Sequence, residues 1–291
     1  MIPFTSYRFL AKDNAVDELG VEMSLLFILV AIVCSLIAIL PAFLIFLYVA
    51  RFKGSMWISA LLGGVFWFLA LLAREPILII LQLGLLPLLS SFYVVLIVIL
   101  FFLGALMAGL FEEGIKYGFL RKYPAFVKTV KHALCFGLGW GLSEAILLYV
   151  VTVLTYGFLY EWLATIVTLP SESQMIFSFI LGAFERNTAI VLHVSATILV
   201  ALAVWHKRFL FAFGAILSHF LFDFIPIMIL QFVLYPFLDP ILAGILAEVL
   251  IAVFAIIFLI LAYWLLKREG GPPEIELEPP SEDKTQVRLD T

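Results

Sequence analysis

Eight runs of apolar residues, separated by short charged or Pro/Gly-containing segments, limit what this chain can fold into. A transmembrane helix needs about 20 mostly apolar residues to cross the hydrocarbon core of a bilayer. Seven of the runs are long enough, whereas the run at 77–89 is too short. The sequence therefore predicts an all-α polytopic membrane helix bundle of about seven transmembrane helices, with 77–89 as a short re-entrant or interfacial segment. The runs are residues 23–50, 55–73, 77–89, 92–111, 132–156, 176–205, 209–235 and 240–266.

Composition supports this class and excludes others. The chain is 65% hydrophobic and 13% charged, whereas soluble proteins are about 45–50% apolar and about 25% charged. A formal net charge of −4 is unsuited to phosphate backbones, so we expect the lipid bilayer and no nucleic acid as its surroundings. Cys34 and Cys135 lie in separate apolar runs, which indicates neither a disulfide framework nor a cysteine-based zinc site.

The distribution of basic residues predicts the topology. With seven spans, the loops rich in Lys and Arg all fall on one side of the membrane, which the positive-inside rule assigns to the cytoplasm. We therefore expect a short extracytoplasmic segment at 1–22, a single transmembrane domain at 23–268, and a cytoplasmic C-terminal tail at 269–291. The tail is rich in Pro and Glu, which predicts disorder. The basic residues concerned are Arg51, Lys53, Arg121, Lys122, Lys128, Lys131, Lys207, Arg208, Lys267 and Arg268.

Several ionisable residues lie inside the apolar runs. Each costs roughly 2.5–3.5 kcal/mol near the centre of a bilayer, so such residues face a cavity, pair with one another or take part in chemistry. Helical spacing places His219 and Asp223 on one face, four residues apart. It does the same for Glu112 and Lys116, and the Gly137-x-x-x-Gly141 pattern lets a neighbouring helix approach the segment that carries Glu144. The residues concerned are Glu112, Glu113, Lys116, Glu144, Glu185, Arg186, His193, His219, Asp223 and Glu248.

Histidines and carboxylates together are the components of a hydrolytic site. Imidazoles bind divalent metals, and a carboxylate can take the proton from an attacking water. The His-Glu-x-x-His signature of soluble metalloproteases is absent, so spacing alone does not identify zinc. Structural interpretations also remain open: Glu112 and Lys116 can form an ion pair at a helix end, and Glu185 and Arg186 can neutralise each other.

Four short motifs on successive predicted helices resemble the PrsW and CAAX-protease superfamily of intramembrane proteases. The chain follows the PrsW-like version, with Glu-Glu-x-x-Lys, a glutamate in the second motif and His-x-x-x-Asp, over about residues 92–225. The stretch Gly137–Leu148, together with Phe184-Glu185-Arg186 and Leu192-His193, looks most like the YhfC-type branch of membrane metalloproteases. The motifs are Glu112-Glu113-Gly114-Ile115-Lys116, Trp140-x-x-x-Glu144, His193 and His219-x-x-x-Asp223.

The resemblance implies an intramembrane endopeptidase that cleaves membrane proteins or peptides with glutamate-activated water. It implies that Glu112 or Glu113 activates the water, with Lys116 and Glu144 in the same catalytic group. It further implies that His193, His219 and Asp223 bind a divalent metal, Zn²⁺, or stabilise the oxyanion, with Glu185 and Arg186 nearby. Because Glu144 and Asp223 replace the His and Asn of the prenyl-protein branch, a prenylated substrate is not expected.

Two other classes of function remain as alternatives. The superfamily is similar to the seven-span scaffold subunit of γ-secretase, which keeps histidines without being the protease. The Glu112-Glu113 pair favours an enzyme over such a scaffold. A proton-coupled transporter could use the intramembrane carboxylates and histidines as a relay. Such carriers usually contain inverted repeats, and no internal repeat is evident in this sequence.

Overall fold

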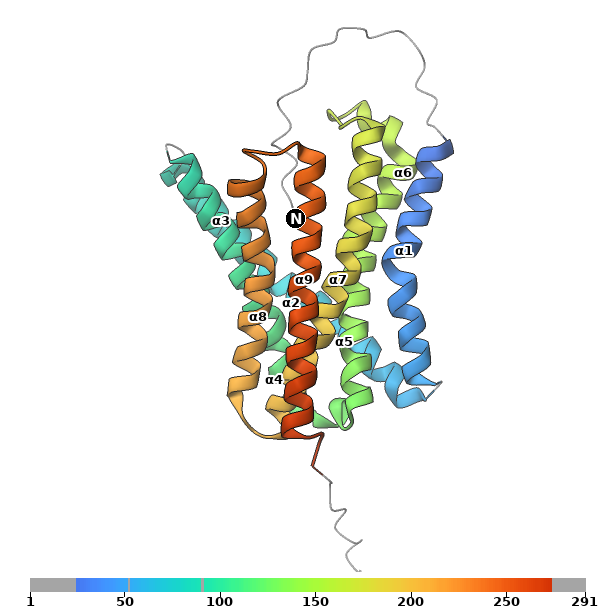
Figure 1. Ribbon diagram of the computed structural model, residues 1–291, viewed down its shortest axis with the longest axis vertical. Helices are drawn as coiled ribbons and strands as arrows, with labels where there is room; N and C mark the ends of the chain where they lie inside the picture. Colours follow the sequence, from blue (N-terminus) through green and yellow to red (C-terminus); the bar gives the residue numbers. More distant parts are fainter. Residues whose placement is uncertain (1–24, 52, 90–91, 274–291) are drawn as a thin grey trace, which may run out of the picture.

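The computed structural model describes residues 25–51, 53–89 and 92–273. The segment expected at 1–22 and the part of the expected tail beyond residue 273 lie outside the described residues. Within them, seven helical segments are long and apolar enough to cross a membrane, which confirms the predicted all-α polytopic membrane fold. Figure 1 shows these segments running up and down through a single bundle.

The first three spans are built as follows. Helix α1 covers Leu25–Ala50 and α2 covers Gly54–Leu89. The third span joins α3 (Tyr93–Ala108) to α4 (Gly114–Lys122) through a turn of π-helix, η2 (Gly109–Glu113).

The remaining spans follow a short 3₁₀ helix at Pro124–Val127. The fourth span comprises α5 (Val130–Glu144), a second π-helical turn, η4 (Ala145–Val150), and α6 (Val151–Ala164). The last three spans are α7 (Glu172–Trp205), α8 (Phe209–Ile229) with its π-helical end η5 (Leu230–Leu234), and α9 (Pro240–Glu269).

Residues 77–89 differ from the expectation, because they form the second half of α2 and not a separate short segment. The charged pair Arg74-Glu75 and the following Pro76 interrupt the apolar run in the sequence, yet the helix continues through them. Proline removes one backbone hydrogen bond, and membrane helices tolerate this loss. The Arg74 guanidinium is stabilised within the bundle, where its Nη1 lies 2.5 Å from Glu112 Oε1.

Helix α7 lies at the centre of the bundle. Of the residues in its apolar stretch, 78% are buried, whereas the buried share is 17–33% in the other spans. Small residues bring the neighbouring helices close: Gly137 and Gly141 of α5 lie against the α7 backbone at Val194 and Ile190. This confirms the close approach predicted from the Gly-x-x-x-Gly pattern. Gly139, on another face of α5, lies against the backbone of Ala60 in α2.

The end of the bundle that carries the basic loops is tightly packed. Buried side chains from α2, α4, α5, α7 and α8 form one core there, including Leu120, Phe136, Leu202 and Ala212. The turns after α1, α4 and α7 and the end of α9 all lie at this end, which is the lower end in Figure 1. Buried polar residues adjoin this core, because its members Trp140 and Trp67 donate hydrogen bonds to Glu112 and Glu144.

Candidate metal centre

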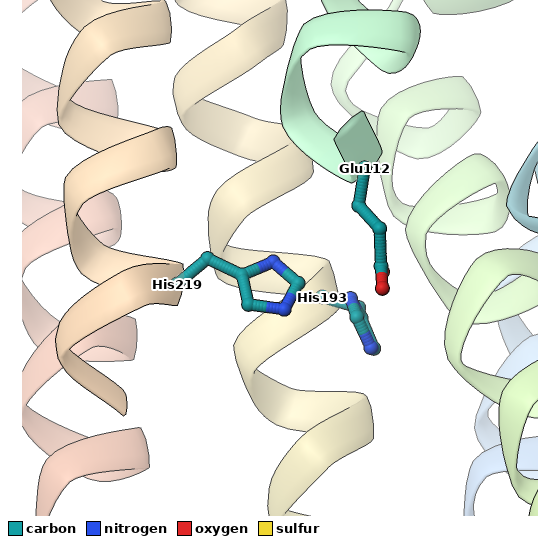
Figure 2. A group of neighbouring side chains, drawn as sticks. All are labelled: Glu112, His193 and His219. Atoms are coloured by element: carbon teal, nitrogen blue, oxygen red, sulfur yellow. The ribbon is translucent and has the colours of Figure 1, made fainter. Parts of the chain in front are cut away.

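Three buried side chains from three different spans meet inside the bundle. Glu112 comes from η2, His193 from α7 and His219 from α8, and they are 3%, 1% and 3% exposed. Each contributes one potential ligand atom, and these atoms lie within 4.8 Å of one another. Figure 2 shows the Glu112 carboxylate and the two imidazole rings gathered in one region between the helical segments. The ring centroids of His193 and His219 are 5.3 Å apart.

The π-helical turn η2 directs two adjacent glutamates to different partners. Successive residues of a helix point in different directions, so neighbours in sequence do not share a face. The Glu112 carboxylate accepts a hydrogen bond from Trp140 Nε1 at 3.0 Å and pairs with Arg74. The Glu113 carboxylate instead pairs with Lys116 Nζ, which lies 2.8 Å from both of its oxygens. Glu113 and Lys116 are both completely buried.

His193 is held through one ring nitrogen. Its Nε2 lies 2.6 Å from Glu144 Oε2. Glu144 is fixed in turn by Arg186 Nη1, at 2.6 Å from Oε1, and by Trp67 Nε1, at 3.2 Å from Oε2. Arg186 also pairs with Glu185. The other ring nitrogen of His193, Nδ1, is buried and has no hydrogen-bond partner.

His219 is held in the same way by a different carboxylate. Its Nδ1 lies 3.0 Å from Glu113 Oε1. Its Nε2 lies 3.6 Å from Asp223 Oδ2, which is beyond hydrogen-bond distance. The Asp223 side chain is 35% exposed, in contrast to the fully buried pair of Glu113 and Lys116. The cluster is therefore closed on the Lys116 side and partly open on the Asp223 side.

This arrangement fits a divalent metal ion. Histidines that bind metals almost always present their second ring nitrogen to a carboxylate or carbonyl, and here Glu144 and Glu113 occupy those positions. The partnerless Nδ1 of His193 is a buried polar atom that a ligand bond would satisfy. Two imidazoles and one carboxylate are also the ligand set of several catalytic zinc sites, which keep a fourth position open.

The charges of the surrounding residues agree with a cationic occupant. Around the group of Glu112, His193 and His219, the described carboxylates outnumber the Lys and Arg side chains by six to three, and a divalent cation would offset part of this excess. The carboxylates are Glu75, Glu112, Glu113, Glu144, Glu185 and Asp223, and the Lys and Arg residues are Arg74, Lys116 and Arg186.

The structure brings together most of the residues singled out in the sequence. Arg186 and His193, seven residues apart on α7, both contact Glu144. Asp223 lies beside His219 but outside the group of three potential ligands, whereas Glu112 belongs to that group. Glu248 contacts no other member of the cluster by a hydrogen bond, and its Oε2 is buried without a partner.

Two residues that hold the cluster together were missed by the sequence reasoning. Arg74 binds Glu112, and Trp67 donates to Glu144, both from α2. Arg74 is a charged residue between two apolar runs, and that signal could have identified it as a membrane-embedded group. Trp67 offers no comparable signal, because an isolated Trp in an apolar run resembles lipid-facing surface.

The fold and this cluster define a polytopic membrane protein with a buried Glu/His/His group suited to a metal. The chain belongs to the YhfC intramembrane metalloprotease family, whose family model matches residues 36–246. It is also 33% identical over 145 residues to a Bacillus subtilis (strain 168) protein described as uncharacterized membrane protein YhfC. That alignment covers 44% of this chain and 56% of the relative, so it spans about half of the relative's length. No solved structure matches this chain significantly.

Proposed function

We propose that this protein is an intramembrane metalloprotease that hydrolyses peptide bonds of membrane-embedded proteins. The observation that carries the proposal is the pair of buried histidines, each with one ring nitrogen on a carboxylate, facing the buried Glu112 carboxylate. A purely structural cluster has no need of the partnerless His193 Nδ1. Family membership supports the same conclusion.

We assign the metal to Glu112, His193 and His219. Glu112 Oε1 accepts a hydrogen bond from Arg74, and Oε2 accepts one from Trp140. Each carboxylate oxygen has a second lone pair that can bind a metal. When bound, Zn²⁺ or a similar ion would supply Lewis acidity to a peptide carbonyl and to water. The Glu144 and Glu113 carboxylates hold the two imidazoles in place for this purpose.

We assign the proton-accepting role to Asp223. The resemblance had implied that Glu112 or Glu113 is the base and that Asp223 is a ligand. In this structure both Glu113 oxygens bind Lys116, and both Glu144 oxygens are engaged by Arg186, Trp67 and His193. Asp223 is the partly exposed carboxylate beside His219, so it is the best placed to take a proton from water and to return it to the leaving amine.

We propose the cytoplasmic side for the end of the bundle that carries the basic loops, in line with the positive-inside rule. The C-terminal end of α9 then faces the cytoplasm and the N-terminal end of α1 faces the outside. Asp223 and Glu75 lie on the extracytoplasmic side of the Glu113–Lys116 pair in this topology.

The test is the metal content and proteolytic activity of the purified protein in detergent. Metal content is measured by mass spectrometry for the wild type, His193→Ala, His219→Ala and the control His206→Ala, which replaces a histidine at the end of α7 outside the cluster. We expect near-stoichiometric metal in the wild type and the control, and its loss in the other two variants. We expect cleavage of a reporter with a transmembrane segment to disappear with the metal. A wild type without metal would refute the proposal.

A further inference from the structure

Each of the three potential metal ligands begins a row of charged side chains, and solvent exposure rises along each row. From Glu112 the row passes to Arg74 and then to Glu75, whose side chains are 4%, 13% and 41% exposed. From His219 the row passes to Asp223, and the exposed share of the side chain rises from 4% to 35%. Both rows therefore run from a closed interior toward a space that solvent reaches.

The row that begins at His193 is the longest and shows the direction of this opening. His193 contacts Glu144, which pairs with Arg186. Arg186 in turn pairs with Glu185, whose side chain is 36% exposed, in contrast to 2% for His193. Glu185 lies eight residues before His193 on α7, which is about 12 Å at a helical rise of about 1.5 Å per residue. The row leads away from the end of the bundle that carries the basic loops.

The three rows border one common space. Asp223 also interacts electrostatically with Glu144 and Arg74, which belong to the other two rows. On the side of α9, Glu248 interacts electrostatically with Glu185. Charged side chains at membrane depth face the interior of a bundle or a water-filled cavity, because an ionised group in hydrocarbon is costly. The space that exposes these carboxylates is therefore aqueous.

Toward the basic loops, this space is closed. Glu113 and Lys116 are completely buried, and every residue of α7 from 192 to 203 except Val194 is buried. The outer part of α7, from 172 to 188, is mostly accessible, and its buried residues are Met175, Phe179 and Ala183. Access to the cluster therefore comes from the opposite end of the bundle, which the proposed topology places on the extracytoplasmic side.

We propose that this space is an acidic aqueous passage that admits water and divalent cations to the metal centre from the extracytoplasmic side. It is bordered by the carboxylates of Glu75, Glu185, Asp223 and Glu248, whereas the two arginines beside it are each already shared between two carboxylates. An excess of one charge in a passage with low-dielectric walls concentrates ions of the opposite sign and repels the others. The use of the admitted water for hydrolysis rests on the proposed proteolytic function.

The test is the reactivity of single cysteines with charged, membrane-impermeant methanethiosulfonate reagents. The full chain, in a Cys34→Ala, Cys135→Ala background, carries Glu185→Cys, or Glu248→Cys should the first variant not fold. The matched control is Phe184→Cys, at the same depth of α7. Phe184 is 58% exposed and lies with the exposed Ile180 on an apolar face of the helix.

Two further cysteines report which end of the bundle a reagent reaches. Thr168→Cys lies in the loop after α6, and Lys128→Cys lies in the loop before α5, at the basic end. Both positions are exposed. The reagents are applied to right-side-out and to inverted membrane vesicles.

We expect Glu185→Cys to react in the vesicles in which Thr168→Cys reacts, and not in those in which Lys128→Cys reacts. Phe184→Cys should react at least about tenfold more slowly, because a thiol in apolar surroundings rarely ionises to the reactive thiolate. The ratio of the rate with a cationic reagent to the rate with an anionic one should be at least about fivefold higher at Glu185→Cys than at Thr168→Cys.

The outcomes separate this inference from the proposed function, because labelling needs neither a bound metal nor proteolysis. Reaction at Glu185→Cys from the Lys128 side, or no faster than at Phe184→Cys, would overturn the passage. An equal reagent ratio at Glu185→Cys and Thr168→Cys would overturn its selection of cations. The expected labelling without any cleavage of reporter proteins would support the passage and refute the proteolytic function, whereas cleavage without labelling would refute the passage alone.

Discussion

Glu144→Gln should weaken metal binding without disrupting the bundle. The Glu144 carboxylate lies 2.6 Å from His193 Nε2, and the substitution keeps its shape but removes its charge. A hydrogen bond to a charged group contributes about 1.5–3 kcal/mol and a neutral one about 0.5–1.5 kcal/mol. The difference of about 1–1.5 kcal/mol corresponds to roughly five- to twelvefold in affinity. Carboxylates behind metal-binding histidines typically account for about 10–100-fold, so we expect a loss of at least about fivefold.

The matched control is Glu185→Gln. Glu185 pairs with the same arginine, Arg186, but does not contact His193. Its replacement should change the metal affinity by less than about twofold, which corresponds to roughly 0.4 kcal/mol. The assay is competition for the metal with a chromogenic chelator, using purified protein in detergent, with a thermal unfolding curve for each variant. Equal affinity of Glu144→Gln and the wild type would show that Glu144 does not support a metal-binding histidine.

Three further predictions concern packing and hydrogen bonding around the cluster. Lys116→Met leaves the buried Glu113 without its cation and should lower the free energy of unfolding by about 3–5 kcal/mol. The control Lys122→Met, at the exposed end of α4, should change the free energy of unfolding by less than about 0.5 kcal/mol. Denaturant titration in detergent measures both variants. Gly139→Val places side-chain atoms against the Ala60 backbone and should lower Tm by several degrees through separation of α2 from α5, whereas Gly214→Val, which meets open space, should change Tm much less. Trp140→Phe removes the donor to Glu112 and should weaken metal binding severalfold in the chelator assay. Because Trp140 is completely buried, the smaller ring leaves a void and should also lower Tm by a few degrees. An unchanged metal affinity of the folded variant would argue against Glu112 as a ligand.

The transmembrane organisation could be predicted because it depends on local properties of the chain. Apolar runs long enough to span a bilayer define the seven spans by themselves. The Gly137-x-x-x-Gly141 pattern likewise predicts a close helix contact from side-chain size alone, and α7 makes that contact in the structure. In both cases the chemistry of one segment determines the outcome, whatever its partner is.

Arg74 and the length of α2 could not be predicted in this way. Two charged residues followed by Pro76 are typical of the end of a membrane helix, which is why 77–89 was expected to be a separate segment. The helix continues because Glu112, nearly forty residues later in the chain, provides the counter-charge inside the bundle. A pairing between residues so far apart in sequence depends on tertiary packing, and the spacing within either segment contains no information about it.

The Glu112-Glu113 pair shows how the same limit applies to the chemistry of the cluster. The resemblance to the PrsW and CAAX-protease superfamily implies that one of the two residues is the catalytic base and does not say which. In the structure the π-helical turn separates them: Glu113 joins Lys116 and His219, whereas Glu112 joins Arg74 and Trp140 beside both histidines. A carboxylate bound at both oxygens by a buried lysine is poorly suited to accept a further proton. In our proposal, the separation therefore makes Glu113 a positioning residue for His219, leaves Glu112 to the metal and transfers the proton-accepting role to Asp223.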